Sequence, residues 1–461
     1  MSKKYTEEEI RTIALSLIGK SFKELKKIDL QKVEDEEEVT KNKAFFGHLL
    51  EEDVYDIAMN SFSRPDFEET NIELKVTPYK KNKNGSLSAK ERLVLNIIDY
   101  MSEYKNNFEN SHFMYKNSRI QIIWYLWEEN KKKEDLRITN ELFYQFPNED
   151  IETIKKDWEY IIQKIKDGKA HELSEADTMY LGACTKGANK ESVRKQPFSN
   201  ILAKQRAFCF KQSYMTGLVR KYIGDYADVE KILNKNETMP EFIDNIINKY
   251  KGKTKTELME ELNVNSNAKN VLSIIINRMF NVKSDLKNTD EFIKANIVPK
   301  TIRIEENGRI IESLSFPYFK FTDVLNVDFE DSFIKESLET TKFMFFVFKK
   351  NDNDYVFKGI KLWNMPENII ENNVKSMYNK TKEVIRTGNI VKYIDDRGRR
   401  ITNFPGLKDN EVCHVRPHGR NSNDTALLPV KDKLTGLRSY TKQCFWINNS
   451  YLKEILKEFD N

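Results

Sequence analysis

Cysteine and histidine are scarce in this sequence, with 4 and 5 copies among 461 residues. No two cysteines are spaced as C-x-x-C, so neither a zinc site nor a disulfide framework is indicated. Glycine (16) and proline (11) are too few for a collagen-like or disordered chain. No apolar run reaches the roughly 18 residues that a membrane span needs, and the N-terminus lacks the apolar region of a signal peptide. We therefore expect a cytoplasmic protein that does not span a membrane.

The sequence does contain enough apolar side chains for a large core. Hydrophobic residues make up 39% of the chain, including 28 Phe and 20 Tyr. At this length two domains are expected. The net charge of +4 is compatible with nucleic-acid binding but is too small to indicate it. Functional predictions must therefore come from local motifs.

The most informative motif is Asp66 followed by Glu73 and Lys75. Residues 71–77 alternate apolar and polar side chains, which is the pattern of a strand with one face in a core. Glu73 and Lys75 would share the other face, about 6.5–7 Å apart. Two carboxylates with open water positions suit Mg²⁺, which polarises a phosphoryl oxygen, while Lys75 would orient or deprotonate the attacking water. The pattern predicts a metal-assisted nuclease site.

A helix predicted over residues 43–58 supplies a further acid. Lys43, Gly47 and Glu51 are spaced by four and therefore lie on one helical face. Glu51 would then reach the metal directly or through water. The alternative interpretation of the motif is an edge strand with a solvated polar face, because charged residues make up 32% of the chain.

These residues and Pro78 resemble the motifs of the MutH family of GATC-directed endonucleases, and within it the staphylococcal GATC-specific type II restriction enzymes. The resemblance implies Mg²⁺-dependent cleavage of double-stranded DNA at GATC. It also implies that Asp66, Glu73 and Lys75 are catalytic, that Glu51 is an accessory acid, and that the three acids hold the metal. Similar segments cover nearly the whole chain, namely residues 84–97, 168–175, 184–189, 204–208, 413–418 and 445–449.

A polar loop beginning at Cys184 is the predicted base-reading element. Mismatch-repair members of the family begin this loop with an arginine, so this chain must read its site with other side chains. Asn189 is suited to adenine and Lys186 to guanine, Lys204 and Arg206 to phosphate, and Lys211 to either. An ordinary surface turn is the alternative. The predicted DNA-binding residues are Lys43, Lys186, Gly187, Asn189, Lys204, Arg206 and Lys211.

The second half of the chain repeats the first in the same order. The boundary is predicted in the charged connector between Leu218 and Met239, which gives domains 1–230 and 231–461. Each half is predicted to be an α/β, restriction-endonuclease-like (MutH-like) domain with a mixed central sheet flanked by helices. The repeated segments are 19–25 with 252–258, 72–77 with 297–302, 120–126 with 343–348, 186–189 with 418–421, and 208–214 with 445–451.

The repeat has lost the acids of the first half. Asn277 stands where the first half has Glu51, Val298 stands at the place of Glu73, and Pro299 interrupts the strand. The second half is therefore predicted to be catalytically silent and to bind a second DNA site. Its predicted effector residues are Lys269, Lys300, Arg416, His418, Arg420 and Asn421.

The sequence thus predicts a type II site-specific deoxyribonuclease. Because one active site cuts one strand, cleavage of both strands implies either sequential nicking or the assembly of two chains on DNA, and we expect a DNA-induced homodimer. The alternatives are a nicking endonuclease of mismatch repair, which leaves the long second half unexplained, and a non-catalytic DNA-binding regulator, which the intact Asp66, Glu73 and Lys75 argue against.

Overall fold

A computed structural model places most of the chain in two compact units. The first is Met1–Thr238 with Asn288–Asn296, and the second is Met239–Lys287 with Ile297–Asn461. The short segment 288–296 therefore packs with the first unit, although a simple division at residue 230 would assign it to the second. The described residues are 4–25, 45–57, 63–187, 192–224, 229–234, 237–266 and 268–460.

The central sheet of the first unit is mixed, with the order β2-β1-β4-β5. Strands β1 and β4 are parallel, and both outer pairs are antiparallel. The predicted strand around residue 73 is confirmed, and its apolar residues Ile72 and Leu74 lie in a core with Phe46 and Tyr125. The bounds are β1 (Glu73–Lys81), β2 (Leu87–Ala89), β4 (Arg119–Leu126) and β5 (Ile138–Gln145).

A second, antiparallel sheet in the first unit has the order β3-β9-β6. A hairpin of β7 and β8 lies between β6 and β9 in the sequence. The strands are β3 (Leu93–Ile97), β6 (Leu181–Thr185), β7 (Val193–Gln196), β8 (Ser199–Lys204) and β9 (Arg206–Phe210). The helices are α1 (Glu7–Ser16), α2 (Phe22–Leu25), α4 (Phe45–Leu49), α5 (His112–Asn117), α6 (Ile151–Lys166), α7 (Gln212–Tyr222) and α11 (Asp290–Ala295).

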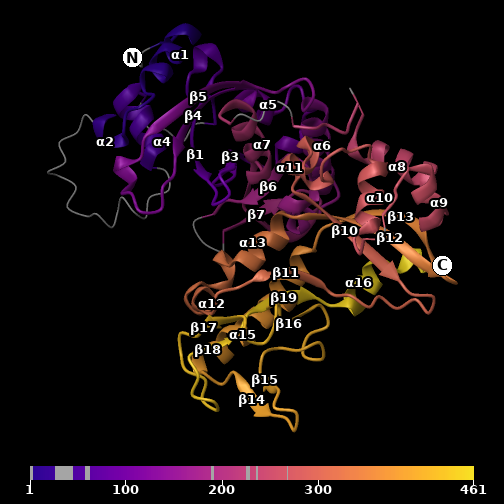
Figure 1. The fold of residues 1–461 in the computed structure, drawn as a ribbon. Helices are drawn as coiled ribbons and strands as arrows, with labels where there is room; N and C mark the ends of the chain where they lie inside the picture. Colours follow the sequence, from indigo (N-terminus) through magenta and orange to yellow (C-terminus); the bar gives the residue numbers. More distant parts are fainter. Residues whose placement is uncertain are drawn as a thin grey trace. The chain divides into compact units, whose positions relative to one another are not determined.

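The main sheets of the second unit repeat these strand orders (Figure 1). One sheet has the order β10-β12-β13, with a parallel first pair and an antiparallel second pair, as in β1-β4-β5. The other has the antiparallel order β11-β19-β16, as in β3-β9-β6. The strands are β10 (Ile297–Ile304), β11 (Leu314–Tyr318), β12 (Lys342–Asn351), β13 (Asp354–Trp363), β16 (Cys413–Pro417) and β19 (Gln443–Ile447). Both units are therefore mixed α/β structures.

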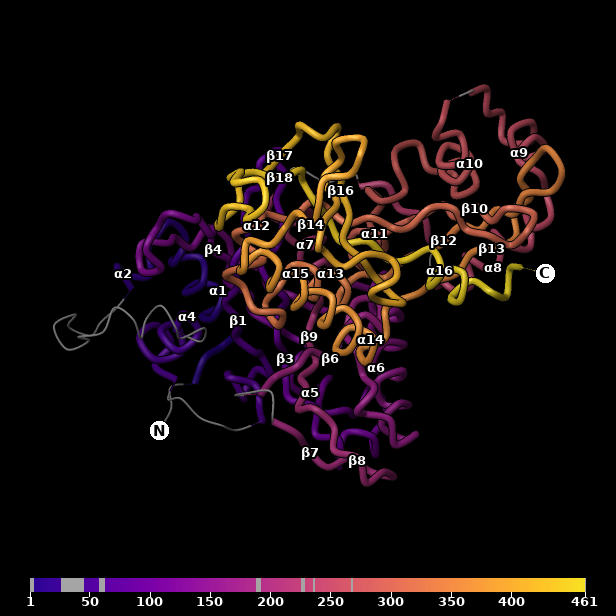
Figure 2. Tube along the Cα trace, turned by 90° about the horizontal axis from the view of Figure 1, so that it is seen from below, coloured from indigo at the N-terminus to yellow at the C-terminus, as the bar shows by residue number. Residues whose placement is uncertain are grey.

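Helices and two further hairpins complete the second unit, as the Cα trace in Figure 2 shows. The hairpins are β14 (Val391–Ile394) with β15 (Arg400–Thr402), and β17 (Thr425–Leu427) with β18 (Ser439–Thr441). The helices are α8 (Met239–Tyr250), α9 (Lys255–Glu261), α10 (Val271–Met279), α12 (Phe321–Asn326), α13 (Phe333–Thr340), α14 (Glu367–Ile369), α15 (Lys375–Thr387) and α16 (Asn449–Ile455). No helix among the described residues is long and apolar enough to cross a membrane.

Local details recur in the two units as well. An asparagine in the left-handed conformation precedes each first strand, Asn71 with φ 50° and Asn296 with φ 51°. A serine also caps the helix that precedes β4 and the helix that precedes β12. Ser111 Oγ accepts a hydrogen bond from the backbone N–H of Met114, and Ser332 Oγ accepts one from that of Lys335. These details match the pairing of 72–77 with 297–302 that the sequence suggests.

Candidate active site

Strand β1 places Glu73, Lys75 and Thr77 on the face opposite its apolar side chains. Glu73 and Thr77 are each only 1% exposed. Lys75 Nζ lies 2.5 Å from Glu73 Oε1. Burial alone would lower the pKa of Lys75, but Glu73 and Asp66 outweigh it and raise the pKa above its usual value. The lysine is therefore held as a cation beside the carboxylate.

A second cation, Lys116, was not predicted from the sequence. Its Nζ lies 3.4 Å from Glu73 Oε1 and donates a hydrogen bond of 3.1 Å to the carbonyl of Arg64. Lys116 lies in the last turn of helix α5, just before β4, and β4 runs parallel to β1 with Ile120 opposite Glu73. Because parallel neighbours begin at the same edge of a sheet, the residues before β4 lie beside the acids of β1.

Asp66 joins the site from the loop before β1. Its Oδ2 accepts a 2.9 Å hydrogen bond from the backbone N–H of Leu74, the residue between Glu73 and Lys75. Burial, followed by the charge of Glu73, raises the pKa of Asp66 to about 7, against the opposing effect of Lys75. Two carboxylates in one buried site repel each other, and this repulsion raises the pKa of one of them unless a cation is bound.

Glu51 lies on a π-helical turn, Leu50–Val54, that continues α4. The charge of Glu51 acts on both Asp66 and Lys75, which places it at the edge of the same site. Gly47 leaves room for it, since a Cβ at Gly47 would lie 3.9 Å from Glu51 Oε1. Lys43, predicted on the same face, lies outside the described residues.

The donor set fits a hard divalent cation. Glu73 Oε2 and Thr77 Oγ1 are buried without a hydrogen-bond partner among the described residues, and a buried carboxylate oxygen is costly unless it meets a cation. All available ligands are oxygens, as Mg²⁺ requires. In the described part of the chain no three acid, histidine or cysteine side chains are preassembled as a metal cage. Asp66 and Glu73 would therefore hold the ion, with Glu51 closing on it or reaching it through water.

The predicted base-reading loop is only partly described. Lys186 and Gly187 are exposed after β6, which suits contact with DNA, whereas Asn189 lies outside the described residues. Cys184 is 1% exposed and lies in β6, so its thiol does not replace the arginine of the mismatch-repair members. Lys204, at the end of β8, is half-buried.

Two predicted DNA contacts require correction. Lys211 is 1% exposed, and its Nζ donates a 2.5 Å hydrogen bond to the carbonyl of Thr178. Arg206 is 4% exposed and donates a 2.7 Å hydrogen bond to the carbonyl of Ala183. As placed here, neither side chain can contact a phosphate. Lys211 instead balances the buried carboxylate of Asp157, which accepts hydrogen bonds from three backbone N–H groups, those of residues 179–181.

The second unit keeps the lysine of this site without its acids. Val298, at the position of Glu73, packs against the core. Lys300, at the position of Lys75, is half-buried, and burial lowers its pKa. The same lysine position therefore has opposite pKa shifts in the two units, because only the first places carboxylates beside it. Lys269 is exposed just before α10.

Four of the predicted effector residues follow one another where β16 ends. Arg416, His418, Arg420 and Asn421 are all exposed. The guanidinium carbon of Arg416 lies 3.9 Å from the ring centroid of Trp446, so stacking orients it. Phe208, Phe210 and Phe445 are buried in the core. Trp446 is half-buried and supports Arg416.

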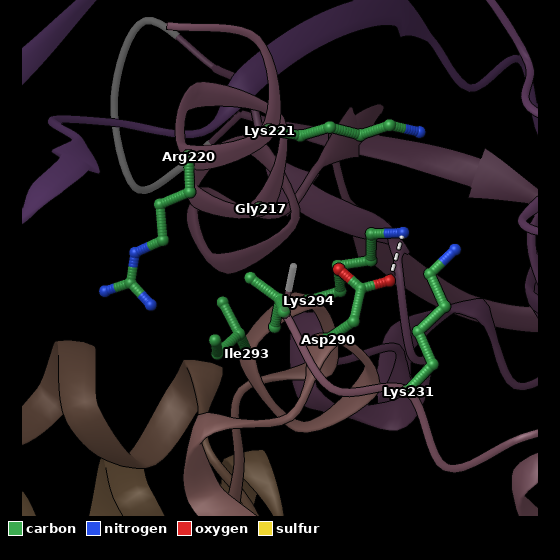
Figure 3. A pocket seen from close by; sticks show the side chains of 8 residues that line it. Gly217, Arg220, Lys221, Lys231, Asp290, Ile293 and Lys294 are labelled. Carbon is green, nitrogen blue, oxygen red and sulfur yellow. Dashed lines mark ion pairs between the residues drawn. The ribbon is translucent and has the colours of Figure 1, made fainter. Parts of the chain in front are cut away.

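Another hollow in the first unit is lined mainly by basic residues and includes none of Asp66, Glu73 and Lys75 (Figure 3). It is formed by α7, α11 and the segment that carries Lys231. Lys294 lies 2.8 Å from Asp290 and 2.9 Å from Asp150, while Lys221 and Lys231 both pair with Glu149. The pair of Lys294 with Asp150 ties segment 288–296 to the rest of the first unit. The hollow has no acid arrangement suited to metal chemistry.

Comparison with known proteins decides the family. The family model "DNA mismatch repair enzyme MutH" matches residues 55–157, which include Asp66, Glu73 and Lys75. The chain is also 35% identical over 491 aligned positions to "Type II restriction enzyme Sau3AI" of Staphylococcus aureus, covering 98% of this chain and 99% of the relative. The chain belongs to the MutH-family type II restriction endonucleases. This endonuclease is therefore a site-specific deoxyribonuclease, and its relationship to the Staphylococcus aureus enzyme covers the second unit as well as the first.

Proposed function

We propose that this endonuclease cuts both strands of double-stranded DNA at GATC, using Mg²⁺ held in the first unit. The observation that carries the proposal is the buried group of Asp66, Glu73 and Lys75, in which one carboxylate oxygen of Glu73 has no hydrogen-bond partner in the described part of the chain. The GATC target rests on the resemblance to the MutH family. The alternative of a non-catalytic regulator does not fit an intact site in a restriction-enzyme relative.

Each residue of the site has a proposed task. Asp66 and Glu73 would hold Mg²⁺ next to the scissile phosphate, and the ion when bound would polarise the phosphoryl oxygen and acidify its water. Lys75, released from Glu73, would orient that water. Lys116 would offset the negative charge that develops on the phosphate. The backbone N–H of Leu74 keeps the Asp66 carboxylate turned toward β1.

Digestion of a supercoiled plasmid tests the activity and its target. We expect linear product with Mg²⁺, no product in a chelator, and ends that sequencing places at GATC. Asp66→Ala should abolish cutting and keep DNA binding, whereas Glu52→Ala, a change of the exposed acid next to Glu51, should cut normally. Open circles that persist would favour the mismatch-repair type of nicking enzyme, and ends at another sequence would reject the GATC assignment.

We also propose that the second unit is a catalytically silent, MutH-like copy that binds a second duplex as an effector. Three observations support this proposal. The strand orders repeat, Asn277 and Val298 stand in the places of Glu51 and Glu73, and the exposed Arg416 stacks on Trp446. Arginine donates two hydrogen bonds to guanine in a major groove, so Arg416 is the base-reading candidate. Lys269, Lys300, His418, Arg420 and Asn421 complete the proposed effector site, with half-buried Lys300 the least accessible.

One acid site per chain also motivates a proposed homodimer on DNA. Two chains would each cut one strand of the same target. Sedimentation of the Asp66→Ala variant with a duplex that carries one site should give two chains per duplex. A single chain per duplex, combined with linear cleavage product from the unaltered enzyme, would reject dimerisation in favour of sequential nicking.

A further inference from the structure

The two units differ in the segment between their long helix and the first strand of the small sheet. In the first unit this segment is 167–180, between α6 and β6, and it contains only short 3₁₀ turns. In the second unit it is 388–412, between α15 and β16, and it carries the β14–β15 hairpin. The hairpin is thus an addition to the unit that has lost the acids.

The hairpin presents cations to solvent. Lys392, Arg397 and Arg399 are exposed. Of its two acids, Asp395 is used inside the turn, because it accepts hydrogen bonds from the backbone N–H groups of Arg397 and Arg399 and from Arg399 Nε at 2.7 Å. Those hydrogen bonds hold the pKa of Asp395 below its usual value. Among the described residues, Lys392 and Arg397 have no ion pair with a neighbour, so both remain available to an outside anion.

The hairpin is fixed beside the loop of the proposed effector site. Arg400 lies with its guanidinium carbon 5.0 Å from the ring centroid of Tyr440, and its Nη2 donates a 3.3 Å hydrogen bond to Thr441 Oγ1. Thr441 Oγ1 in turn donates a 2.9 Å hydrogen bond to the carbonyl of Ser422 in the loop after Arg416.

The chain that leaves the hairpin is also tied to β16, because the N–H of Val415 bonds to the carbonyl of Pro405 at 2.8 Å. Both views of the fold place β14 near β16, β17 and β18 (Figures 1 and 2). Arg400 thus braces the hairpin, and Lys392 and Arg397 are left for the ligand.

We infer that the β14–β15 hairpin is a backbone-gripping arm of the effector site, which holds the sugar-phosphate chain of the duplex that Arg416 reads. This inference rests on the proposed effector function. Phosphate contacts position a protein on DNA and carry no sequence information, so exposed Lys392 and Arg397 suit this task. Tyr393 and Ile394, 51% and 54% exposed, lie between them in sequence and offer an apolar surface to the deoxyribose.

The test uses the full chain carrying Asp66→Ala, titrated with a labelled GATC duplex at several salt concentrations. We expect two separable binding events, a first at the unit that carries Asp66 and a second at the effector site. Lys392→Gln with Arg397→Gln should weaken the second binding event, and the slope of log K against log salt should fall by about 0.9 for each lost phosphate contact. The double variant should lose affinity for a duplex without GATC by the same factor, because phosphate contacts do not depend on the sequence. The matched control, Lys453→Gln with Lys457→Gln, removes two exposed charges of the same unit and should leave the second event unchanged.

Arg416→Ala separates the two proposals. If Arg416→Ala weakens the second binding event and the hairpin variant does not, the arm is wrong and the effector site stands. If the hairpin variant changes sequence preference without changing the salt slope, the hairpin reads bases, and backbone gripping is overturned. If only one binding event is seen, or neither variant alters the second event, the effector site itself fails and the arm fails with it.

Discussion

Replacing Asp66 by asparagine should stabilise the metal-free enzyme while it destroys cleavage. The carboxyl of Asp66 is buried beside Glu73, and its pKa rises from 3.8 to about 7 in the folded chain. Asparagine keeps an oxygen that accepts the N–H of Leu74 but never carries the charge. The variant therefore removes the electrostatic penalty that metal binding relieves in the natural enzyme.

The size and sign of the effect follow from proton linkage. Between pH 3.8 and about 7 the folded chain binds the Asp66 proton more tightly than the unfolded chain does, so stability is lost as pH rises through this range. The full shift corresponds to about 4 kcal/mol, at about 1.4 kcal/mol per pKa unit. From pH 5 to pH 8 the advantage of Asp66→Asn over the natural enzyme should grow by about 3 kcal/mol, because about two units of the shift fall in that interval.

Urea unfolding in a chelator, followed by tryptophan fluorescence at pH 5 and pH 8, measures this difference. Glu52→Gln is the control, since it neutralises an exposed acid nearby and should show no such change with pH. Saturating Mg²⁺ should raise the unfolding free energy of the natural enzyme at pH 8 and leave Asp66→Asn unaffected. A gap that is the same at both pH values would refute the assignment of a strained, buried carboxylate.

Three further predictions concern activity and stability. Cleavage at a fixed, sub-saturating Mg²⁺ concentration and fixed ionic strength should rise tenfold per pH unit up to about 7 and then level off, because Asp66 must lose its proton to hold the ion; a pH-independent rate from 5 to 8 would contradict this. Lys75→Met should lower the cleavage rate by about 10²–10³ with DNA affinity retained, while Lys166→Met, on the exposed face of α6, should cut normally. Lys211→Met should cost about 3 kcal/mol of unfolding free energy, because Asp157 loses its buried counter-charge, and should leave the DNA affinity of the folded enzyme unchanged. A large loss of DNA affinity without loss of stability would restore Lys211 as a DNA contact.

The alternation of apolar and polar residues was sufficient to predict the strand that carries Glu73 and Lys75. Residues 71–77 alternate with a period of two, and the structure buries Ile72 and Leu74 on one side and presents Glu73 and Lys75 on the other. The mixed α/β character was also predictable, because apolar runs alternate with charged helical segments. The Asp66 position followed from its place just before the strand.

Side chains that depend on distant partners could not be predicted in this way. Lys211 and Arg206 look like surface cations in the sequence, and only the fold reveals that Asp157, more than fifty residues earlier, accompanies Lys211 into the interior. Lys116 reaches the site because β4 lies parallel to β1, and the pairing of two strands cannot be predicted from the sequence of either strand alone. The β14–β15 hairpin was missed because its charges interrupt the alternation that signals a strand.

The left-handed asparagines at 71 and 296 bear on how backbone strain at active sites is interpreted. Such a conformation costs a non-glycine residue on the order of 1 kcal/mol, and beside a catalytic strand it invites an explanation in terms of chemistry. The same left-handed conformation recurs before β10, and strand β10 carries no carboxylate. Because it occurs in both units, this conformation belongs to the connection before the first strand and not to the chemistry of the candidate site. Substitutions that relieve this strain should therefore destabilise the first strand in both units. Such substitutions would not change activity independently of folding stability.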